Sequence, residues 1–233
     1  MRVLVWNVFW RTGDFAARAR RIRGLVERWR PDVALLTECP WPDDALLGAE
    51  WRWEYAPTER IGDQPVGLCV AARSRLVASA PGRWPLVLLE DGTAVAAAHL
   101  PWRGGDAAGR RDELEALAGH SFLTGASACL IGGDFNCLPG SDELGGLGRR
   151  GFVDCWASAR ERRGPEDTRP RDRWARACEA HGFRAPHAPQ VFGRIDQLWT
   201  RGLAPKSAEV VPEGEDDGAP VSDHRPLIVE LAS

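Results

Sequence analysis

The sequence has no run that approaches the roughly 18 consecutive apolar residues of a membrane-spanning helix. Its opening stretch, MRVLVWNVFW, also lacks the basic start, long apolar centre and small-residue cleavage site of a secretory signal peptide. We therefore expect a cytoplasmic protein without a membrane partner. No segment indicates an obligate protein partner.

The six cysteines form no C-x-x-C pair and show no spacing typical of a zinc site. In a cytosolic chain we expect reduced, partly buried thiols and no disulfide framework. The formal net charge of −3 gives no overall reason to expect a polyanion or a membrane surface as partner. No repeat with a period of about 20–50 residues is present, which excludes a solenoid or propeller.

What is present is a mixture of strand and helix patterns. RVLVWNV and DVALLTE are typical of buried strands, and between them an apolar face from Phe15 to Trp29 follows the cap residue Asp14 and predicts a helix. PLVLLEDGTAVAAAHL predicts a hairpin turning at Asp91-Gly92. A chain of 233 residues suits one large sandwich or barrel, since such domains reach about 200–250 residues. We expect an α/β architecture with antiparallel pairs.

Polar side chains occur where these apolar segments stop. The residues concerned are Asn7, Glu38, His99, Asp134, Asn136, Asp196, Asp223 and His224. Taken singly, each has a structural explanation, because Asp and Asn favour turns and a lone histidine is often hydrogen-bonded in a core. Taken together, several buried carboxylates each need compensation, and a shared divalent cation compensates them at once. The set therefore favours one polar cluster at one end of the core.

Five short motifs carry a resemblance to a known group. GGDFNCLPGSDEL, RIDQLW and SDHRPL, with WNV near the start and LLTE after the first helix, are similar in order and spacing to the endonuclease/exonuclease/phosphatase superfamily. The resemblance covers essentially the whole chain. It implies a four-layer sandwich, an α/β (α+β) fold of two packed mixed β-sheets flanked by helices. It also implies a single domain over residues 1–233, with the site at the open end between the sheets.

The resemblance further implies a divalent-metal-dependent phosphoesterase. Glu38 matches the position of the principal metal ligand, and Asn7 and Asp223 match positions that complete or support the coordination. An oxygen-and-amide cluster of this kind favours Mg²⁺ or Mn²⁺ over zinc. A cation is needed because a general base alone supplies about 10²–10⁴-fold, well short of typical enzymatic accelerations.

The remaining motif positions imply the catalytic roles. His224 matches the general base for an attacking water, Asp196 the carboxylate that orients it, and Asp134 the group that orients the water or assists the leaving group. Asn136 and His99 match positions that hold phosphoryl oxygens. Attack by water without a phospho-enzyme is expected, because no Ser, Cys or Thr stands in these motifs as a nucleophile.

The substrate is less well determined by the sequence. A phosphodiesterase or nuclease is the first expectation, a small-molecule phosphatase the second, and a non-catalytic binding module a distant third. His99 argues against abasic-site repair, since enzymes of that kind in the superfamily usually have Tyr there. The expected partner is a phosphate ester, with nucleic acid or a nucleotide as one option.

Two further patterns bear on the substrate. Trp10, Trp41 and Trp102 each follow a candidate site residue by three positions, so their rings are predicted to bind substrate or simply to cover loop ends. Residues 149–184 hold ten arginines against six acidic residues. That excess suits either contact with a phosphate backbone or a solvated surface with internal ion pairs.

Overall fold

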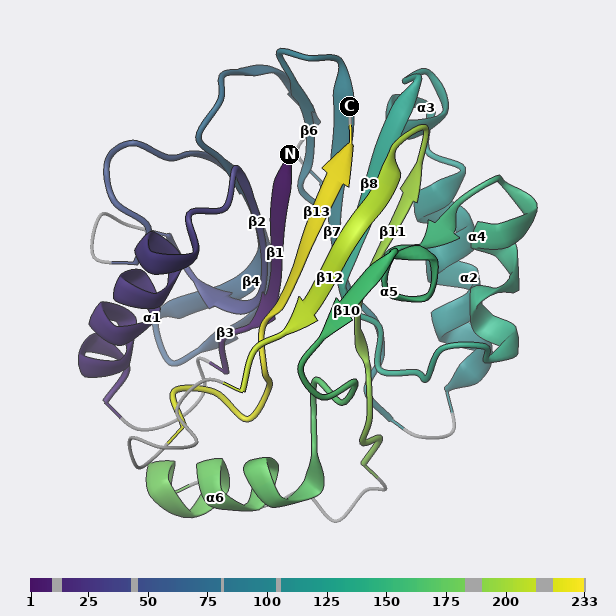
Figure 1. Ribbon diagram of the computed structural model, residues 1–233. Helices are drawn as coiled ribbons and strands as arrows, with labels where there is room; N and C mark the ends of the chain where they lie inside the picture. The colour runs from purple at the N-terminus through teal and green to yellow at the C-terminus, as the bar shows by residue number, and fades with distance from the viewer. Residues whose placement is uncertain are drawn as a thin grey trace.

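The computed structural model describes residues 1–9, 14–42, 46–80, 82–103, 106–182, 190–212 and 220–232. Two mixed β-sheets pack face to face (Figure 1). In spatial order, the seven-stranded sheet contains β10 (Glu161–Arg163), β12 (Ala204–Val210), β13 (Leu227–Ala232), β1 (Arg2–Asn7), β2 (Val33–Pro40), β4 (Gln64–Ala72) and β3 (Arg52–Ile61). The six-stranded sheet contains β5 (Leu76–Ala80), β6 (Leu86–Leu89), β7 (Thr93–His99), β8 (Ala128–Asp134), β11 (Asp196–Arg201) and β9 (Val153–Asp154).

Helices cover the outer faces of both sheets and one end of the sandwich (Figure 1). The helices are α1 (Phe15–Trp29), α2 (Ala107–Ala118), α3 (Ser121–Thr124), the 3-10 helix η1 (Asp142–Leu144), α4 (Gly145–Arg149), α5 (Cys155–Ser158) and α6 (Arg171–His181). α1 lies outside the seven-stranded sheet and α2 and α4 lie outside the six-stranded sheet, whereas α6 crosses the end of the sandwich opposite the two chain termini.

Side chains that alternate along the strands produce three apolar layers. In β1, Val3 and Val5 point between the sheets and meet Val95 and Leu130, whereas Leu4 and Trp6 point outward into a layer with helix α1. A third layer packs α2 against the outer face of the six-stranded sheet. Because successive strand residues face opposite sides, both faces of each central strand are buried. The four-layer sandwich implied by the sequence motifs is confirmed.

The local predictions for α1 and the hairpin are confirmed, with one difference at the turn. Asp14 caps α1 by accepting a hydrogen bond from the Ala17 amide at 3.1 Å. The β6–β7 hairpin turns through three residues instead of two, since Gly92 N donates to Leu89 O at 3.0 Å and Gly92 has φ +82°. A three-residue loop closed by a left-handed glycine is a common hairpin geometry. Strand β5 carried no clear sequence signal.

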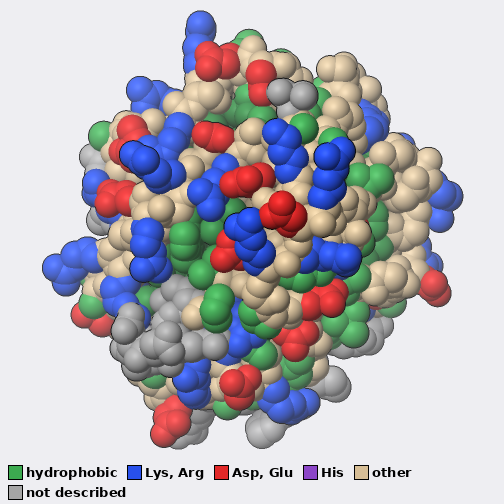
Figure 2. Space-filling view, in the orientation of Figure 1, with side chains coloured by type: hydrophobic (Ala, Val, Ile, Leu, Met, Phe, Trp, Pro, Cys, Tyr) green, Lys and Arg blue, Asp and Glu red, His purple; other side chains and the backbone are tan. Residues whose placement is uncertain are grey.

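The expectation of reduced, buried thiols is met, and several surface arginines pair with acids. All six cysteines are buried free thiols. The surface arginines lie among acids, as Figure 2 shows for one face. In the arginine-rich segment, Arg149 and Arg150 reach Glu115 and Arg163 pairs with Glu161. Within the part of the chain that is described, no helix is long and apolar enough to cross a membrane.

Candidate active site

Three candidate residues lie side by side at one edge of the six-stranded sheet. His99 ends β7, Asp134 ends the parallel neighbour β8, and Asp196 begins the antiparallel strand β11. Strand register pairs Asp134 with His99 on one side and with Asp196 on the other. The direction of each strand thus explains why two residues that end strands meet one that begins a strand.

The seven-stranded sheet delivers the other candidates to the same end of the sandwich. β1 ends at Asn7, and the loop before the antiparallel strand β13 carries Asp223 and His224. Ser222 ties this loop to β1, because its hydroxyl donates to Asn7 O at 2.6 Å and accepts from His224 N at 3.1 Å. The indole of Trp6 donates to His224 O at 3.1 Å. These bonds hold the loop in one conformation.

Glu38 lies in an irregularity of β2. The β2–β4 register shifts between Leu36 and Cys39, and Glu38 has a φ of +46° inside this bulge. Left-handed backbone is unfavourable for a residue with a Cβ, and bulges commonly redirect a side chain beside a functional site. The strand continues to Pro40, two residues beyond the end predicted at Glu38. The bulge sends the Glu38 carboxylate to the cavity instead of into the sheet interior.

Asn7 connects the carboxylates of the two sheets. Its amide Nδ2 donates to Asp134 Oδ2 at 3.0 Å and to Glu38 Oε1 at 3.3 Å, while its Oδ1 accepts from Phe9 N at 3.0 Å. The amide oxygen is therefore directed at the backbone and not at the carboxylates. In this arrangement Asn7 supports the acidic cluster through its nitrogen.

His224 is paired with a fully buried carboxylate. Its Nδ1 lies 2.6 Å from Asp196 Oδ2, and its Nε2 lies 3.8 Å from both Asp134 Oδ2 and Asp223 Oδ2. Burial lowers the pKa of His224, but Asp196, Asp223 and Asp134 outweigh burial and raise that pKa to about 9. The separations at Nε2 suit a bridging water, since a polar contact longer than 3.5 Å commonly holds one.

Asp134 is the most connected carboxylate of the cluster. Oδ1 accepts from Asn136 N at 3.0 Å, and Oδ2 lies 3.7 Å from His99 Nε2. Burial raises the pKa of Asp134, but His224, His99, Arg169 and the Asn7 hydrogen bond together bring it below its ordinary value. The surrounding cationic and hydrogen-bonding groups thus favour the carboxylate form of Asp134. Asn136, at φ +49°, donates its side-chain nitrogen to Leu100 O at 2.9 Å and so fastens the β8 end to the β7 end.

These residues surround a cavity of about 130 Å³. Its lining brings together candidates from both sheets: Glu38, His99, Trp102, Asp134, Asn136, Asp223 and His224. Trp102 is thus at the cavity, whereas Trp41 is 53% exposed and packs against Trp53 and Tyr55 with ring centroids 5.0 and 5.2 Å apart. Trp10 lies outside the described residues.

Comparison with known proteins agrees with this geometry. Residues 4–224 match the model of the Endonuclease/Exonuclease/phosphatase family. The chain belongs to this family. Membership identifies it as a hydrolase of phosphate esters. No curated protein matches the sequence.

Several solved structures share the family fold with this chain. A functionally unknown conserved protein from Enterococcus faecalis V583 superposes with a TM-score of 0.76 at 18% identity, covering 100% of both chains. A mannosyl-6-phosphatase from Bacteroides thetaiotaomicron gives 0.69 at 14% identity, again over 100% of both. TDP2 from D. rerio, complexed with a single-strand DNA product, gives 0.72 at 16% identity over 100% of this chain and 99% of that one. At these identities the likeness establishes the fold.

The family is generally dependent on a divalent metal, and the donor set here fits such an ion. Asp134, Asp196 and His224 offer ligand atoms within 4.8 Å of one another, but the short Asp196–His224 hydrogen bond already occupies two of these groups. Among the described residues, Asp223 Oδ1 is buried without a hydrogen-bond partner. An unpartnered carboxylate oxygen beside further acids, in an oxygen-rich cavity, is typical of a site for a divalent cation.

Sequence reasoning missed four residues that line the cavity, namely Phe9, Arg169, Trp174 and Gln190. Three of them flank or lie in the charged, irregular segment before β11. The local arginine excess was the available signal, but it did not distinguish Arg169 from its exposed neighbours. The isolated β-bridge between Arg169 and Gly193 reveals that this position lies against the segment that leads into β11.

Proposed function

We propose that this protein hydrolyses a phosphate ester by attack of water, with the aid of a divalent cation. The observation that carries the proposal is the His224–Asp196 pair, whose outer nitrogen lies 3.8 Å from two carboxylates. This arrangement supports a base poised over a bound water molecule, next to acids that require a cation. A merely structural histidine would not need three surrounding carboxylates.

In the proposed reaction, His224 Nε2 accepts a proton from the attacking water while Nδ1–H donates to Asp196. Asp196 keeps the imidazole in the tautomer that leaves Nε2 free and stabilises the imidazolium as it forms. Asp134, an anion beside Nε2, orients the water. His99 and Asn136 line the cavity where phosphoryl oxygens would lie, and His99 would donate a hydrogen bond as charge develops there.

Glu38 and Asp223 would hold Mg²⁺ or Mn²⁺, with Asn7 keeping Glu38 and Asp134 in place. When bound, the ion supplies positive charge to the phosphoryl oxygens and lowers the pKa of water. A cation held by Glu38 and Asp223 would also offset negative charge around His224, which would favour the neutral imidazole that can act as a base.

Two substrate classes remain candidates. The sequence motifs place a phosphodiester first, and the likeness to TDP2 solved with a single-strand DNA product is in keeping with it. A phosphomonoester is favoured by a specific observation, the presence of the buried Arg169 in the lining of the same cavity as His224. The mannosyl-6-phosphatase of the same fold is in keeping with this second class.

One substrate panel tests the proposal. It contains p-nitrophenyl phosphate, bis-p-nitrophenyl phosphate, single- and double-stranded DNA and RNA, each with Mg²⁺, Mn²⁺ or chelator. We expect hydrolysis of at least one ester with either ion and none with chelator. Activity that persists in chelator would contradict the proposed cation, and absence of turnover on all five would contradict the proposed reaction.

A further inference from the structure

Arg169 is held against the segment that leads into β11, the strand that begins at Asp196. Its backbone exchanges two hydrogen bonds with Gly193, from Arg169 N at 3.0 Å and from Gly193 N at 3.1 Å. The adjacent Thr168 hydroxyl accepts from Ile195 N and Asp196 N at 3.1 and 3.0 Å. The position of this arginine is therefore coupled to the catalytic strand and not to the exposed surface.

The guanidinium is also held by hydrogen bonds, but not all of its N–H donors are used. Nε donates to Asp223 Oδ2 at 3.3 Å, Nη1 to Val191 O at 3.2 Å and Nη2 to Gln190 Oε1 at 3.1 Å. These bonds use three of its five N–H groups, one on each nitrogen. One N–H on each terminal nitrogen is left, and the side chain, 10% exposed, lines the cavity.

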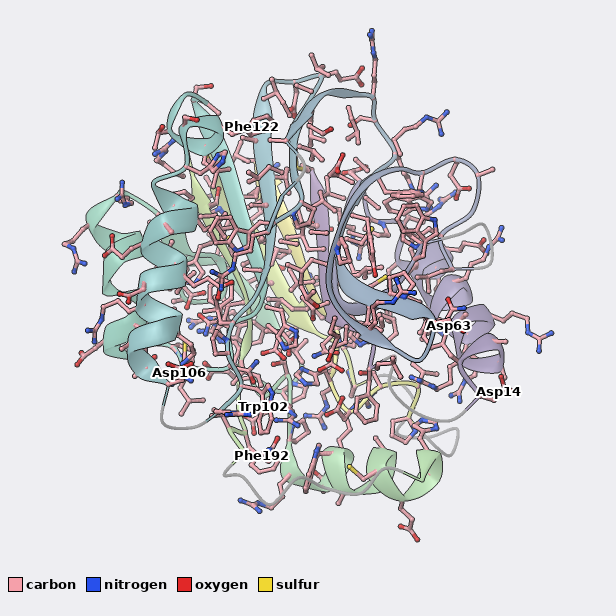
Figure 3. All side chains as sticks on the ribbon, turned by 180° about the vertical axis from the view of Figure 1, so that it is seen from behind. Asp14, Asp63, Trp102, Asp106, Phe122 and Phe192 are labelled. Atoms are coloured by element: carbon pink, nitrogen blue, oxygen red, sulfur yellow. The ribbon has the colours of Figure 1, made fainter. Side chains whose placement is uncertain are left out.

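Two aromatic rings, Trp174 of α6 and Phe192, pack beside the guanidinium. It lies 5.4 Å from the Phe192 ring centroid and 5.9 Å from that of Trp174, and these rings pack edge-on 5.5 Å apart. α6 itself is anchored, because Arg173 Nε donates to Ser222 O at 3.1 Å. Figure 3 shows Trp102 and Phe192 at this same end, next to α6. Such a preorganised cation binds an anion at low entropic cost.

Arg169 also places a positive charge among the acids that line the cavity. The cavity is lined by the carboxylates of Glu38, Asp134 and Asp223, and Arg169 is the sole arginine or lysine in its described lining. A phosphomonoester differs from a diester by a further non-bridging oxygen and, near neutral pH, by a further negative charge. A fixed guanidinium with two free N–H groups complements that added oxygen through charge-assisted hydrogen bonds.

We propose that Arg169 determines specificity by binding the terminal oxygens of a phosphomonoester, so that the substrate is a small organic molecule ending in a phosphate. This inference rests on the proposed function and narrows its substrate class. The phosphate of a nucleic-acid end presents the same chemistry, and a 5′-phosphorylated oligonucleotide beside p-nitrophenyl phosphate separates the two sources. Preference for the oligonucleotide would overturn the small-molecule part of the proposal.

The test compares Arg169→Gln with wild type on p-nitrophenyl phosphate and bis-p-nitrophenyl phosphate. Loss of two charge-assisted hydrogen bonds should lower kcat/KM for the monoester by about 30-fold or more, while the diester changes by less than about threefold. Arg169→Lys keeps the charge but not the planar pair of donors, and should lie between the two. Arg149→Gln, on the surface beside Glu115, is the matched control and should change neither rate.

The kinetic comparison also distinguishes a direct role of Arg169 from an indirect one. Equal losses of kcat/KM on both esters, with altered Mn²⁺ affinity by calorimetry, would mean that Arg169 acts through Asp223, and would overturn the proposal.

A second experiment measures the binding of inorganic phosphate in Mg²⁺ by calorimetry. This binding does not depend on turnover, so the experiment applies even if neither ester is hydrolysed. At least tenfold weaker phosphate binding in Arg169→Gln supports the proposal, and unchanged binding overturns it. Gln190→Ala, which frees Nη2 without removing the cation, serves if Arg169→Gln does not fold.

Discussion

The side-chain nitrogen of Asn7 lies 3.0 Å from Oδ2 of Asp134, and this contact joins the end of β1 in one sheet to the end of β8 in the other. The same nitrogen reaches Glu38 at 3.3 Å. One amide thus brings together two carboxylates that would otherwise repel each other. The contact therefore helps to hold the rims of the two sheets in the relative position that forms the cavity.

Removing either member of the His224–Asp196 pair should abolish most of the hydrolysis. His224→Ala removes the proposed base, and Asp196→Asn leaves the imidazole without its orienting carboxylate. We expect each to lower kcat by about 10²–10⁴-fold on the best substrate of the panel, and the double variant to be little worse than the single ones. His120→Asn keeps a capping side chain at α3 far from the cavity and should behave as wild type. Near-normal turnover of His224→Ala would refute the assigned base.

The stability of the metal-free protein should fall at alkaline pH. The pKa of His224 is about 9 in the folded protein and about 6.5 unfolded. The raised pKa stabilises the fold fully below about pH 6.5, and that contribution, at most about 3 kcal/mol, is lost as the pH rises through 9. We expect the Tm in chelator to drop by several degrees between pH 6.5 and 9.5, and the drop to be smaller in His224→Gln. Parallel profiles for the two proteins would show that His224 is not the group responsible.

A divalent cation should stabilise the fold through Glu38. At a Mg²⁺ or Mn²⁺ concentration 100 times the Kd, mass action adds about 2.7 kcal/mol, which corresponds to a rise in Tm of about 5–10 °C. Glu38→Gln should lose most of this rise. Glu27→Gln, an exposed glutamate paired with Arg23 on α1, should keep it. An equal shift in both variants would argue against the assigned ligand.

The two described tryptophans singled out by the sequence should behave differently. Trp102 lines the cavity, so Trp102→Ala should raise KM by about fivefold or more, in keeping with a loss of about 1–3 kcal/mol of ring contact. Trp41 packs on Trp53 and Tyr55, and Trp41→Ala should leave KM within about twofold. Steady-state kinetics on the same ester measures both. The reverse order would mean that substrate extends toward Trp41.

Gly133 should tolerate no side chain. A Cβ there would lie 1.9 Å from the backbone oxygen of Ala98, and its φ is +141°, a conformation that favours glycine. We expect Gly133→Ala to cost more than about 3 kcal/mol in the free energy of unfolding and to displace Asp134. Gly24→Ala, in α1 with nothing within 4 Å, should stabilise by about 0.5–1 kcal/mol. Urea unfolding of both variants is the measurement.

Much of the secondary structure could be predicted from the sequence because its determinants are local. The cap at Asp14, the apolar face of α1 and the turn at Gly92 are set by residues within a few positions of one another, and hydrogen-bond geometry then decides the element. The candidate residues were readable for a related reason. Acids, amides and imidazoles at the ends of apolar strands stand out against the surrounding pattern. The five motifs that contain them also occur along the chain in the order of the family. The bulge at Glu38 was not readable, since periodicity alone cannot show an extra residue in a strand.

The sequence alone thus determined which elements form and which polar residues end them, because backbone propensity and apolar periodicity act over short stretches of chain. Only the tertiary structure decided that Asp134 pairs with both His99 and Asp196, that Asn7 offers its nitrogen to the acids, and that Arg169 enters the cavity beneath α6. These relations join residues tens to hundreds of positions apart. They follow from sheet order, strand direction and register, which are settled by the packing of the whole core and by no single segment.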